Sequence, residues 1–170
     1  MDHDAVRHPA RPRRHNRRFL RGFTLVELTI VVLIIGVVSA IVLSRFRGTL
    51  ARHRVEAAAN RIVNDVNLAC RYARIGSTEY KVTFNVANDS YRLPQFADPD
   101  HPTERYDIAL DDEPYKVRIV SADFDGDAEI KFNGYGMPDS GGTVVLQAAG
   151  YQVTVEVDPD TGHAYRKAYE

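Results

Sequence analysis

The stretch Phe23–Leu43, FTLVELTIVVLIIGVVSAIVL, decides how this chain is organised. Fifteen of its 21 residues are Leu, Ile, Val or Phe, and Glu27 is its one ionisable side chain. As a helix it would be about 31 Å long, close to the roughly 30 Å of a bilayer core. The apolar residues favour insertion by about 4.5–9 kcal/mol, more than the roughly 2.5–3.5 kcal/mol that a mid-membrane carboxylate costs. We therefore expect residues 23–43 to form a transmembrane helix.

Charge is distributed unevenly along the 170 residues, although the net charge is only −1. Residues 1–22 carry seven Arg against two Asp, whereas residues 77–170 carry eight Lys or Arg against eighteen Asp or Glu. The basic N-terminus predicts that the leader stays in the cytoplasm and that the chain after Leu43 lies in the periplasm. The acidic C-terminal half would repel a phosphate backbone, which makes nucleic acid an unlikely partner.

Glu27 is the most informative residue of the apolar stretch. An ionisable side chain inside a membrane suggests a function, because the chain loses stability by keeping it there. The sequence offers no cation within residues 23–43, but cleavage after Gly22 would create one, the α-amine of Phe23 on a neighbouring copy. The alternative is a carboxylate that only reaches back to the membrane surface.

Arg21-Gly22-Phe23-Thr24-Leu25-Val26-Glu27-Leu28, followed by the apolar run, resembles the class III signal of type IV prepilins and type II secretion pseudopilins. The resemblance implies that a prepilin peptidase cuts between Gly22 and Phe23 and methylates the new amine. It also implies that Glu27 pairs with a neighbouring subunit's N-terminus, so other pilin or pseudopilin subunits and inner-membrane lipid are the expected partners. The leader is longer than many in the family, and Ser44 stands where many major pilins have proline, which favours a minor subunit.

A different export signal also fits part of this region. Arg17-Arg18-Phe19-Leu20-Arg21 resembles a twin-arginine signal, and Val38-Ser39-Ala40 resembles a small-residue cleavage site. The mature chain would then be a soluble periplasmic protein starting near Ile41. Against this hypothesis, the apolar run exceeds the usual 7–15 residues of a signal core, and a Glu has no role there.

After Leu43 the pattern becomes amphipathic and predicts that one helix continues from about Phe23 to Ile75. Small and apolar residues recur at spacings of three and four, at Ala51, Val55, Ala58, Ile62, Val66, Ala69 and Ala73. Gly76 is the expected C-cap. The single cysteine, Cys70, excludes an intramolecular disulfide and is expected to be a small buried hydrophobe.

From Thr78 onward the apolar period is two, which predicts antiparallel hairpins. The candidate strands are Tyr80–Val86, Ser90–Leu93, Tyr106–Leu110, Tyr115–Val120, Ala128–Asn133, Thr143–Gln147, Tyr151–Val157 and His163–Lys167, with Pro94–Thr103 as a loop. The expected class is α+β, a long N-terminal helix with an amphipathic second half packed against a small antiparallel sheet head, as in pilins. The expected divisions are a removed leader (1–22), a membrane or filament-core helix (23–43), its amphipathic continuation (44–76) and a periplasmic β-rich head (77–170).

From the second half of the expected helix onward, the chain resembles the minor pseudopilin family of general secretion pathway protein H and the FimT pilus protein. The resemblance rests on Ala59, Arg61, Asp65, Ala73 and Arg74 in the helix, and on Ile130, Phe132, Gly136 and Pro138 after it. It implies a structural subunit of a type II secretion pseudopilus or a related type IV pilus-like filament. The alternative within the same fold is a FimT-like minor pilin that captures DNA, which would need a basic tail or loop.

Few residues suggest chemistry. Asp123, Asp125 and Asp127 alternate around Gly126 and are weak calcium candidates, because the glycine is one position early for an EF-hand and no distal Glu follows. Asp139-Ser140-Gly141-Gly142 predicts a turn rather than a protease nucleophile loop. We find no P-loop, dinucleotide-binding or HExxH motif, so we expect neither enzymatic activity nor a firm cofactor.

Overall fold

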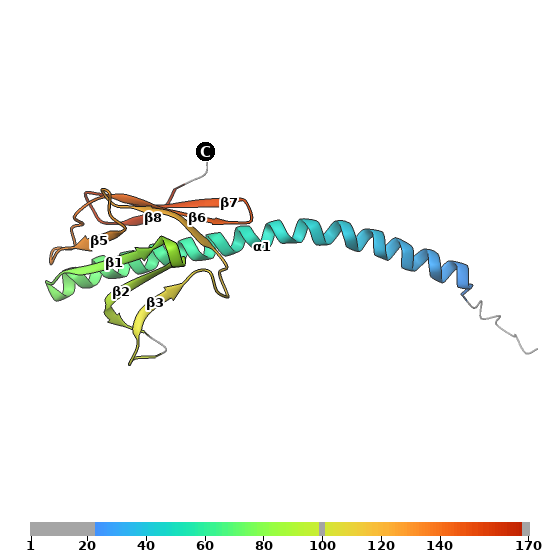
Figure 1. The fold of residues 1–170 in the computed structure, drawn as a ribbon, viewed down its shortest axis with the longest axis horizontal. Helices are drawn as coiled ribbons and strands as arrows, with labels where there is room; N and C mark the ends of the chain where they lie inside the picture. Colours follow the sequence, from blue (N-terminus) through green and yellow to red (C-terminus); the bar gives the residue numbers. More distant parts are fainter. Residues whose placement is uncertain (1–22, 99–100, 168–170) are drawn as a thin grey trace, which may run out of the picture. The chain divides into compact units, whose positions relative to one another are not determined.

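The computed structural model describes residues 23–98 and 101–167, without the side chains of residues 40–47. The chain forms two compact units, which divide between Ile41 and Val42. The helix α1 (Leu25–Gly76) contains most of the described residues of the first unit and continues into the second (Figure 1). Within the described residues, no helix is long and apolar enough to cross a membrane.

The second unit contains two four-stranded antiparallel sheets, in the orders β3-β2-β1-β5 and β4-β6-β7-β8. The strands are β1 (Tyr80–Asn85), β2 (Ser90–Ala97), β3 (Arg105–Ala109), β4 (Arg118–Asp123), β5 (Glu129–Phe132), β6 (Gly142–Ala148), β7 (Tyr151–Val157) and β8 (Ala164–Arg166). A short 3-10 helix, η1 (Val86–Asn88), separates β1 from β2. The expected α+β class, a helix packed on a small antiparallel β-sheet head, is confirmed.

One hydrophobic core joins the second half of α1 to both sheets. The helical stripe expected from the sequence is buried at each of its positions, from Ala51 to Ala73. Residues from the inner faces of the strands complete the core, among them Val82, Leu93 and Ile130 in the first sheet and Leu146 and Val155 in the second. The prediction that Cys70 is a buried hydrophobe is confirmed.

The prediction of a loop over Pro94–Thr103 was wrong at its start, because β2 continues through Pro94 to Ala97. Proline cannot donate to a strand ladder and is tolerated where pairing is interrupted. Here β1 pairs with β2 only from Thr83 to Asn85, and the β2–β3 register shifts between Leu93 and Ala97. Pro94 therefore falls in an irregular part of the strand, where its missing N–H is harmless.

The end of β1 and the start of β4 also differ from the prediction, because the backbone groups there bond to a side chain and within a turn. Val86 leaves β1, since the Asn85 side chain accepts hydrogen bonds from the N–H groups of Ala87 and Asn88 and starts η1. The strand predicted to begin at Tyr115 begins at Arg118. The N–H groups of Tyr115 and Lys116 donate instead to the Asp112 carbonyl, 3.0 and 2.9 Å away.

The end of α1 also differs in detail from the expectation. Gly76 is the last helical residue, but the left-handed conformation falls on Ser77, with φ of 47°. The Thr78 N–H then donates to the Ala73 carbonyl over 3.3 Å, the bond of a Schellman ending. Gly134 approaches this end closely, because a Cβ on it would lie 2.8 Å from the Ser77 carbonyl carbon.

Candidate functional site

At the start of α1, Thr24 caps the helix, with Phe23 one residue before it and Glu27 three residues after it. Gly22 lies outside the described residues, whereas Phe23 is 80 % exposed. The Thr24 hydroxyl accepts a hydrogen bond from the Glu27 N–H (3.1 Å), and its carbonyl accepts one from Leu28 (3.1 Å). Thr24 with Glu27 three positions later is the pattern of a capping box. Helix structure therefore begins directly after the expected cleavage point.

The Glu27 carboxylate lies in the first turn of α1, where the helix dipole favours a negative charge. Glu27 is exposed, and its carboxylate has no hydrogen-bond or ion-pair partner among the described residues. A cation from another molecule could approach it, and an α-amine would form a charge-assisted hydrogen bond with it. The geometry is thus compatible with the pairing expected for Glu27.

The side chains around Glu27 are apolar and exposed on all sides of the helix. Twelve large hydrophobic residues between Phe23 and Val38 are 43–80 % exposed. Burying a Val, Leu, Ile or Phe side chain contributes about 1.5–3 kcal/mol, so covering twelve half-exposed ones contributes on the order of 10 kcal/mol. A helix that is apolar all round requires an apolar environment, such as lipid or the core of an assembly.

The other polar side chains of this segment are satisfied within the helix. The Thr29 hydroxyl donates to the Val26 carbonyl (2.8 Å), and the Ser39 hydroxyl donates to the Ile35 carbonyl (2.7 Å). Burial of hydroxyls that are bonded in this way costs little free energy, because they keep a hydrogen bond when water is removed. Glu27 is therefore the side chain whose burial depends on a partner from another molecule.

In the head, Asp65 forms a buried polar cluster with Arg61, Tyr91 and Tyr106. Its carboxylate, 5 % exposed, accepts hydrogen bonds from the Tyr91 hydroxyl (2.6 Å), the Tyr106 hydroxyl (3.1 Å) and Arg61 Nε (3.0 Å). Arg61 also donates to the Tyr106 hydroxyl. The cluster joins α1 to β2 and β3. The sequence offered only the i, i+4 spacing of Arg61 and Asp65, and the two tyrosines, 26 and 41 residues further on, were missed.

Electrostatics within this cluster favour protonated tyrosines and a charged arginine. Burial raises the pKa of Tyr91 well above its usual value, and the adjacent Asp65 carboxylate adds to the effect. Burial and Asp65 also raise the pKa of Tyr106. Burial disfavours the charged form of Arg61, but the Asp65 carboxylate outweighs it and raises the pKa of the guanidinium.

Further contacts tie α1 to the second sheet and the loops beside it. The Asn67 amide pairs with the backbone of Ala164 through bonds of 3.1 and 3.0 Å, as a neighbouring strand would. Arg74 donates to the Thr161 carbonyl (3.2 Å) and Cys70 to the Gly136 carbonyl (3.3 Å). The second half of α1 is thus bonded to both sheets.

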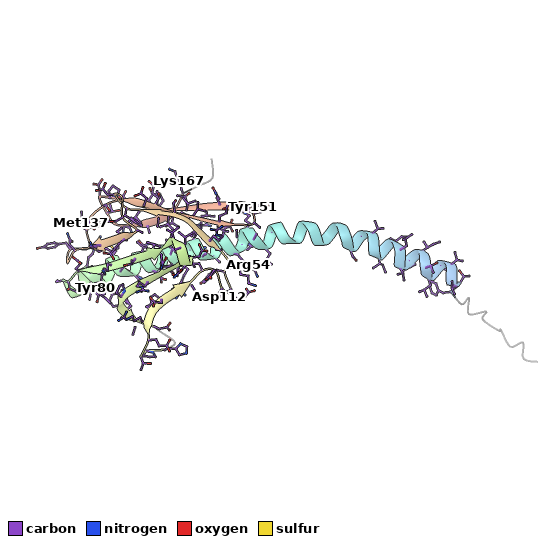
Figure 2. The ribbon with its side chains drawn as sticks, in the orientation of Figure 1. Arg54, Tyr80, Asp112, Met137, Tyr151 and Lys167 are labelled. Carbon is purple, nitrogen blue, oxygen red and sulfur yellow. The ribbon has the colours of Figure 1, made fainter. Side chains whose placement is uncertain are left out.

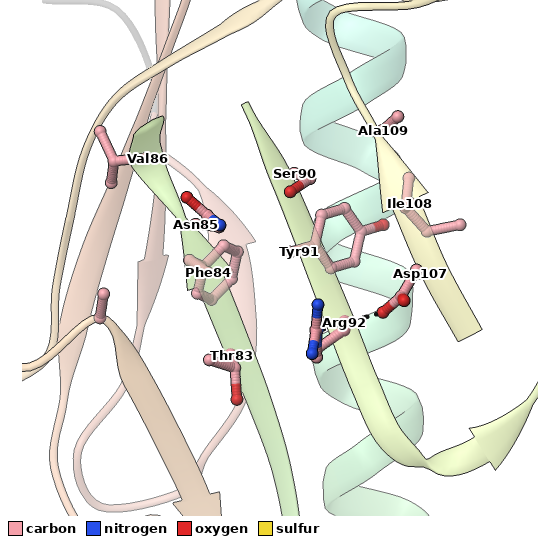
Figure 3. A pocket seen from close by; sticks show the side chains of 11 residues that line it. Thr83, Phe84, Asn85, Val86, Ser90, Tyr91, Arg92, Asp107, Ile108 and Ala109 are labelled. Carbon is pink, nitrogen blue, oxygen red and sulfur yellow. Dashed lines mark ion pairs between the residues drawn. The ribbon is translucent and has the colours of Figure 1, made fainter. Parts of the chain in front are cut away.

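A pocket of about 570 Å³ lies over β1, β2 and β3 (Figure 3). Its charged side chains and several of its other polar side chains are bonded within the chain. Arg92 and Asp107 form an ion pair of 3.2 Å, the Tyr91 hydroxyl donates to Asp65, and the side-chain oxygen of Asn85 caps η1. The pocket offers a ligand no charged group without a partner of its own, and we assign it no role.

The calcium candidates fall in a tight hairpin. Phe124 and Asp127 pair through backbone bonds of 2.8 and 3.3 Å, while Asp125 and Gly126 have φ of 58° and 93°, as in a type I′ turn. The Asp123 carboxylate accepts the Gly126 N–H (2.9 Å), so it stabilises the turn. Across the described residues, no three His, Cys, Asp or Glu side chains form a group that could hold a metal ion. The Asp123 carboxylate and the left-handed backbone of Asp125 thus serve the turn, and Asp127 contributes its backbone to it.

Comparison with known proteins gives a match at the N-terminal end of the chain. Residues 17–43 match the family described as the prokaryotic N-terminal methylation motif, a segment that includes Phe23, Thr24 and Glu27. Neither a curated protein nor a solved structure matches the chain. The chain thus carries a prepilin-type N-terminal methylation motif at the start of a long helix packed on a β-sheet head, which supports its assignment to the type IV pilin-like proteins.

Proposed function

We propose that this chain is a minor pseudopilin, a structural subunit of a type II secretion pseudopilus or a related type IV pilus-like filament, with no enzymatic role. A prepilin peptidase would cut between Gly22 and Phe23 and methylate the amine of Phe23. Residues 23–43 would anchor the precursor in the inner membrane, with the head in the periplasm. The observation that carries the proposal is a methylation motif whose Glu27 lies in the first turn of a helix with apolar side chains exposed on every side.

The physical basis of assembly would be the exchange of one apolar environment for another. In the precursor, lipid would cover the exposed side chains between Phe23 and Val38, and in the filament the corresponding helices of neighbours would do so. Such an exchange leaves the hydrophobic contribution nearly unchanged, so polar contacts decide its direction. A buried carboxylate without a partner is strongly unfavourable. Pairing of Glu27 with the Phe23 amine of a neighbour would therefore favour assembly and fix the axial register of the subunits.

The charge of the head supports a structural role over DNA capture. Residues 77–170 carry eighteen acidic residues against eight Lys or Arg. At the end of the described chain, Arg166 is exposed but Lys167 lies 3.5 Å from the Glu156 carboxylate. A basic patch free of acidic neighbours would be needed for salt-dependent phosphate binding.

The N-terminus of the mature protein tests the proposal directly. The full-length chain is expressed together with a prepilin peptidase, purified from membranes, and its N-terminal peptide is analysed by mass spectrometry. An N-methylated Phe23 is expected. A mature chain that keeps residues 1–22 would exclude processing, and one that starts near Ile41 would support the twin-arginine alternative instead. Crosslinking to other pilin-like subunits, and secretion measured with the gene deleted, then test the pseudopilus assignment.

A further inference from the structure

The hairpin between β6 and β7 turns beside α1 at Gly48. Ala148 pairs with Tyr151, and Ala149 and Gly150 make the turn with φ of 45° and 87°. A Cβ on Gly48 would lie 3.3 Å from the Tyr151 hydroxyl oxygen and 3.8 Å from its Cε2. The glycine therefore lets the Tyr151 ring lie directly on the helix. Figure 2 shows Tyr151 at one end of the head, where it lies beside α1.

The position of Gly48 along α1 sets the level of this hairpin. The apolar segment ends at Leu43, five residues earlier, and the helix is continuous between them. At 1.5 Å per residue this is about 7.5 Å. The polar layer on each side of a bilayer core is about 5–7.5 Å thick. With residues 23–43 across the membrane, the hairpin tip would lie at the level of the lipid headgroups.

The composition of the hairpin suits that level. Residues 140–155 contain no Asp, Glu, Lys, Arg or His, in a head where acidic residues are otherwise frequent. Tyr151 is 42 % exposed, and Leu50, two residues beyond Gly48, is exposed to a similar extent. Tyrosine is enriched at membrane interfaces, because its ring is apolar and its hydroxyl can bond to headgroups and water. An uncharged tip can also approach the interface without losing the hydration of a charge.

We infer that the β6–β7 hairpin tip, Ala148–Tyr151, contacts the headgroup layer of the membrane before the subunit enters a filament. This inference rests on the membrane-anchored helix of the proposed function. We assign this surface to the lipid interface rather than to a second copy of the chain for two reasons. The tip lies close to Leu43 along α1, and the hairpin carries no charged side chain. The contact would hold the head at the bilayer surface and would be released on assembly.

The chain has no tryptophan, so single tryptophan substitutions report on their surroundings without background. Y151W reports on the hairpin and L33W on the apolar helix. Y135W is the control, because Tyr135 is 84 % exposed and lies at the other end of the head. It lines a pocket with Ser77, a residue that follows Gly48 by about 40 Å along the axis of α1. L50W reports on the level of the helix beside the hairpin, because Leu50 lies two residues from Gly48 on another face of α1, and it checks that level if the larger ring at position 151 disturbs the packing on Gly48. Each full-length variant is reconstituted in vesicles of phosphatidylethanolamine and phosphatidylglycerol with acyl chains brominated near the headgroup or near the chain end.

We expect Y151W and L50W to lose most of their fluorescence when bromine is near the headgroup. L33W should lose most of its fluorescence when bromine is near the chain end, and Y135W should keep its fluorescence with both lipids. If L33W is quenched while Y151W and L50W behave like Y135W, the inference is wrong and the proposed anchoring stands. If L33W is not quenched either, both are wrong. A blue-shifted but unquenched emission from Y151W would show that protein, such as a second copy, covers the tip, and would also overturn the inference.

Discussion

The Tyr91 hydroxyl donates a hydrogen bond of 2.6 Å to the Asp65 carboxylate and so joins β2 to the helix through a buried charge. Arg61 and Tyr106 complete the coordination of this carboxylate. The apolar stripe of α1 could pack on the sheets in neighbouring registers, since most of its positions are alanine or valine. A single buried acceptor with three specific donors distinguishes among those registers.

Removal of this acceptor is expected to destabilise the head strongly. Asp65→Ala leaves Arg61 and two buried hydroxyls without their partner, which costs about 3–5 kcal/mol for a broken buried pair. Urea unfolding of the full-length protein in detergent, followed by far-UV circular dichroism, measures the change. Asp107→Ala is the matched control, because Asp107 pairs with Arg92 on the half-exposed surface and its loss costs at most about 1 kcal/mol. Equal losses in the two variants would contradict the anchoring role of Asp65.

Alkaline pH is expected to weaken the fold through Tyr91. Burial, together with the Asp65 carboxylate, raises the pKa of Tyr91 well above the usual 10.0, so the folded state holds this proton more tightly than the unfolded state. The contribution to stability is complete below pH 10 and is lost as pH rises toward the higher folded pKa. The unfolding free energy should therefore fall steeply above about pH 10 in the native chain and less steeply in Tyr91→Phe. Parallel pH profiles for the two proteins would exclude Tyr91 as the cause.

Much of the fold follows from periodicity, and the departures come from residues that act over long distances. The helical stripe and all eight strands could be predicted because their apolar spacing is a local property of the sequence. The strand position of Pro94 and the left-handed Ser77 at the helix end could not be predicted in this way. Each depends on which backbone N–H and C=O groups nearby are left without a hydrogen bond. Phe23 and Glu27 were identified from a local motif, whereas the tyrosines on Asp65 depend on which strands meet α1. The contact of Tyr151 with Gly48 likewise joins residues about a hundred positions apart and has no local pattern.

Processing is expected to require Gly22. A peptidase must bring its catalytic groups close to the backbone between Gly22 and Phe23, and a side chain at position 22 would obstruct that approach. Gly22→Leu should accumulate at the length of the unprocessed chain when it is expressed with a prepilin peptidase, as seen on a gel and by intact mass. Gly36→Leu is a suitable control, since a side chain there would meet nothing within 4 Å. Full processing of Gly22→Leu would contradict the predicted cleavage position.

Assembly, rather than processing, is expected to depend on Glu27. Glu27→Leu removes the charge but keeps the apolar helix and the Thr24 cap, so N-methyl Phe23 should still form. Without the carboxylate, a neighbour's amine would be buried without a partner, and incorporation into filaments should fall by tenfold or more for a loss of about 1.4 kcal/mol or above. Incorporation is measured as the fraction of subunit in sheared or crosslinked filaments, with Glu27→Asp as the variant that retains the charge. Normal incorporation of Glu27→Leu would remove the pairing argument.

The loop that closes over the end of α1 is expected to depend on Gly136 for two separable reasons. Its φ of 72° is unfavourable for other residues, and a Cβ there would lie 2.3 Å from Nε of Arg74, the side chain that bonds the Thr161 carbonyl. Gly150 shares the first property, with φ of 87°, but has nothing within 4 Å of the same Cβ. Gly150→Ala should therefore cost only the backbone strain, about 1–2 kcal/mol. Gly136→Ala should cost about 1–3 kcal/mol more, because Arg74 must move and give up its bond. Urea unfolding of both variants measures the difference, and equal losses would show that the contact between Gly136 and Arg74 does not stabilise the head.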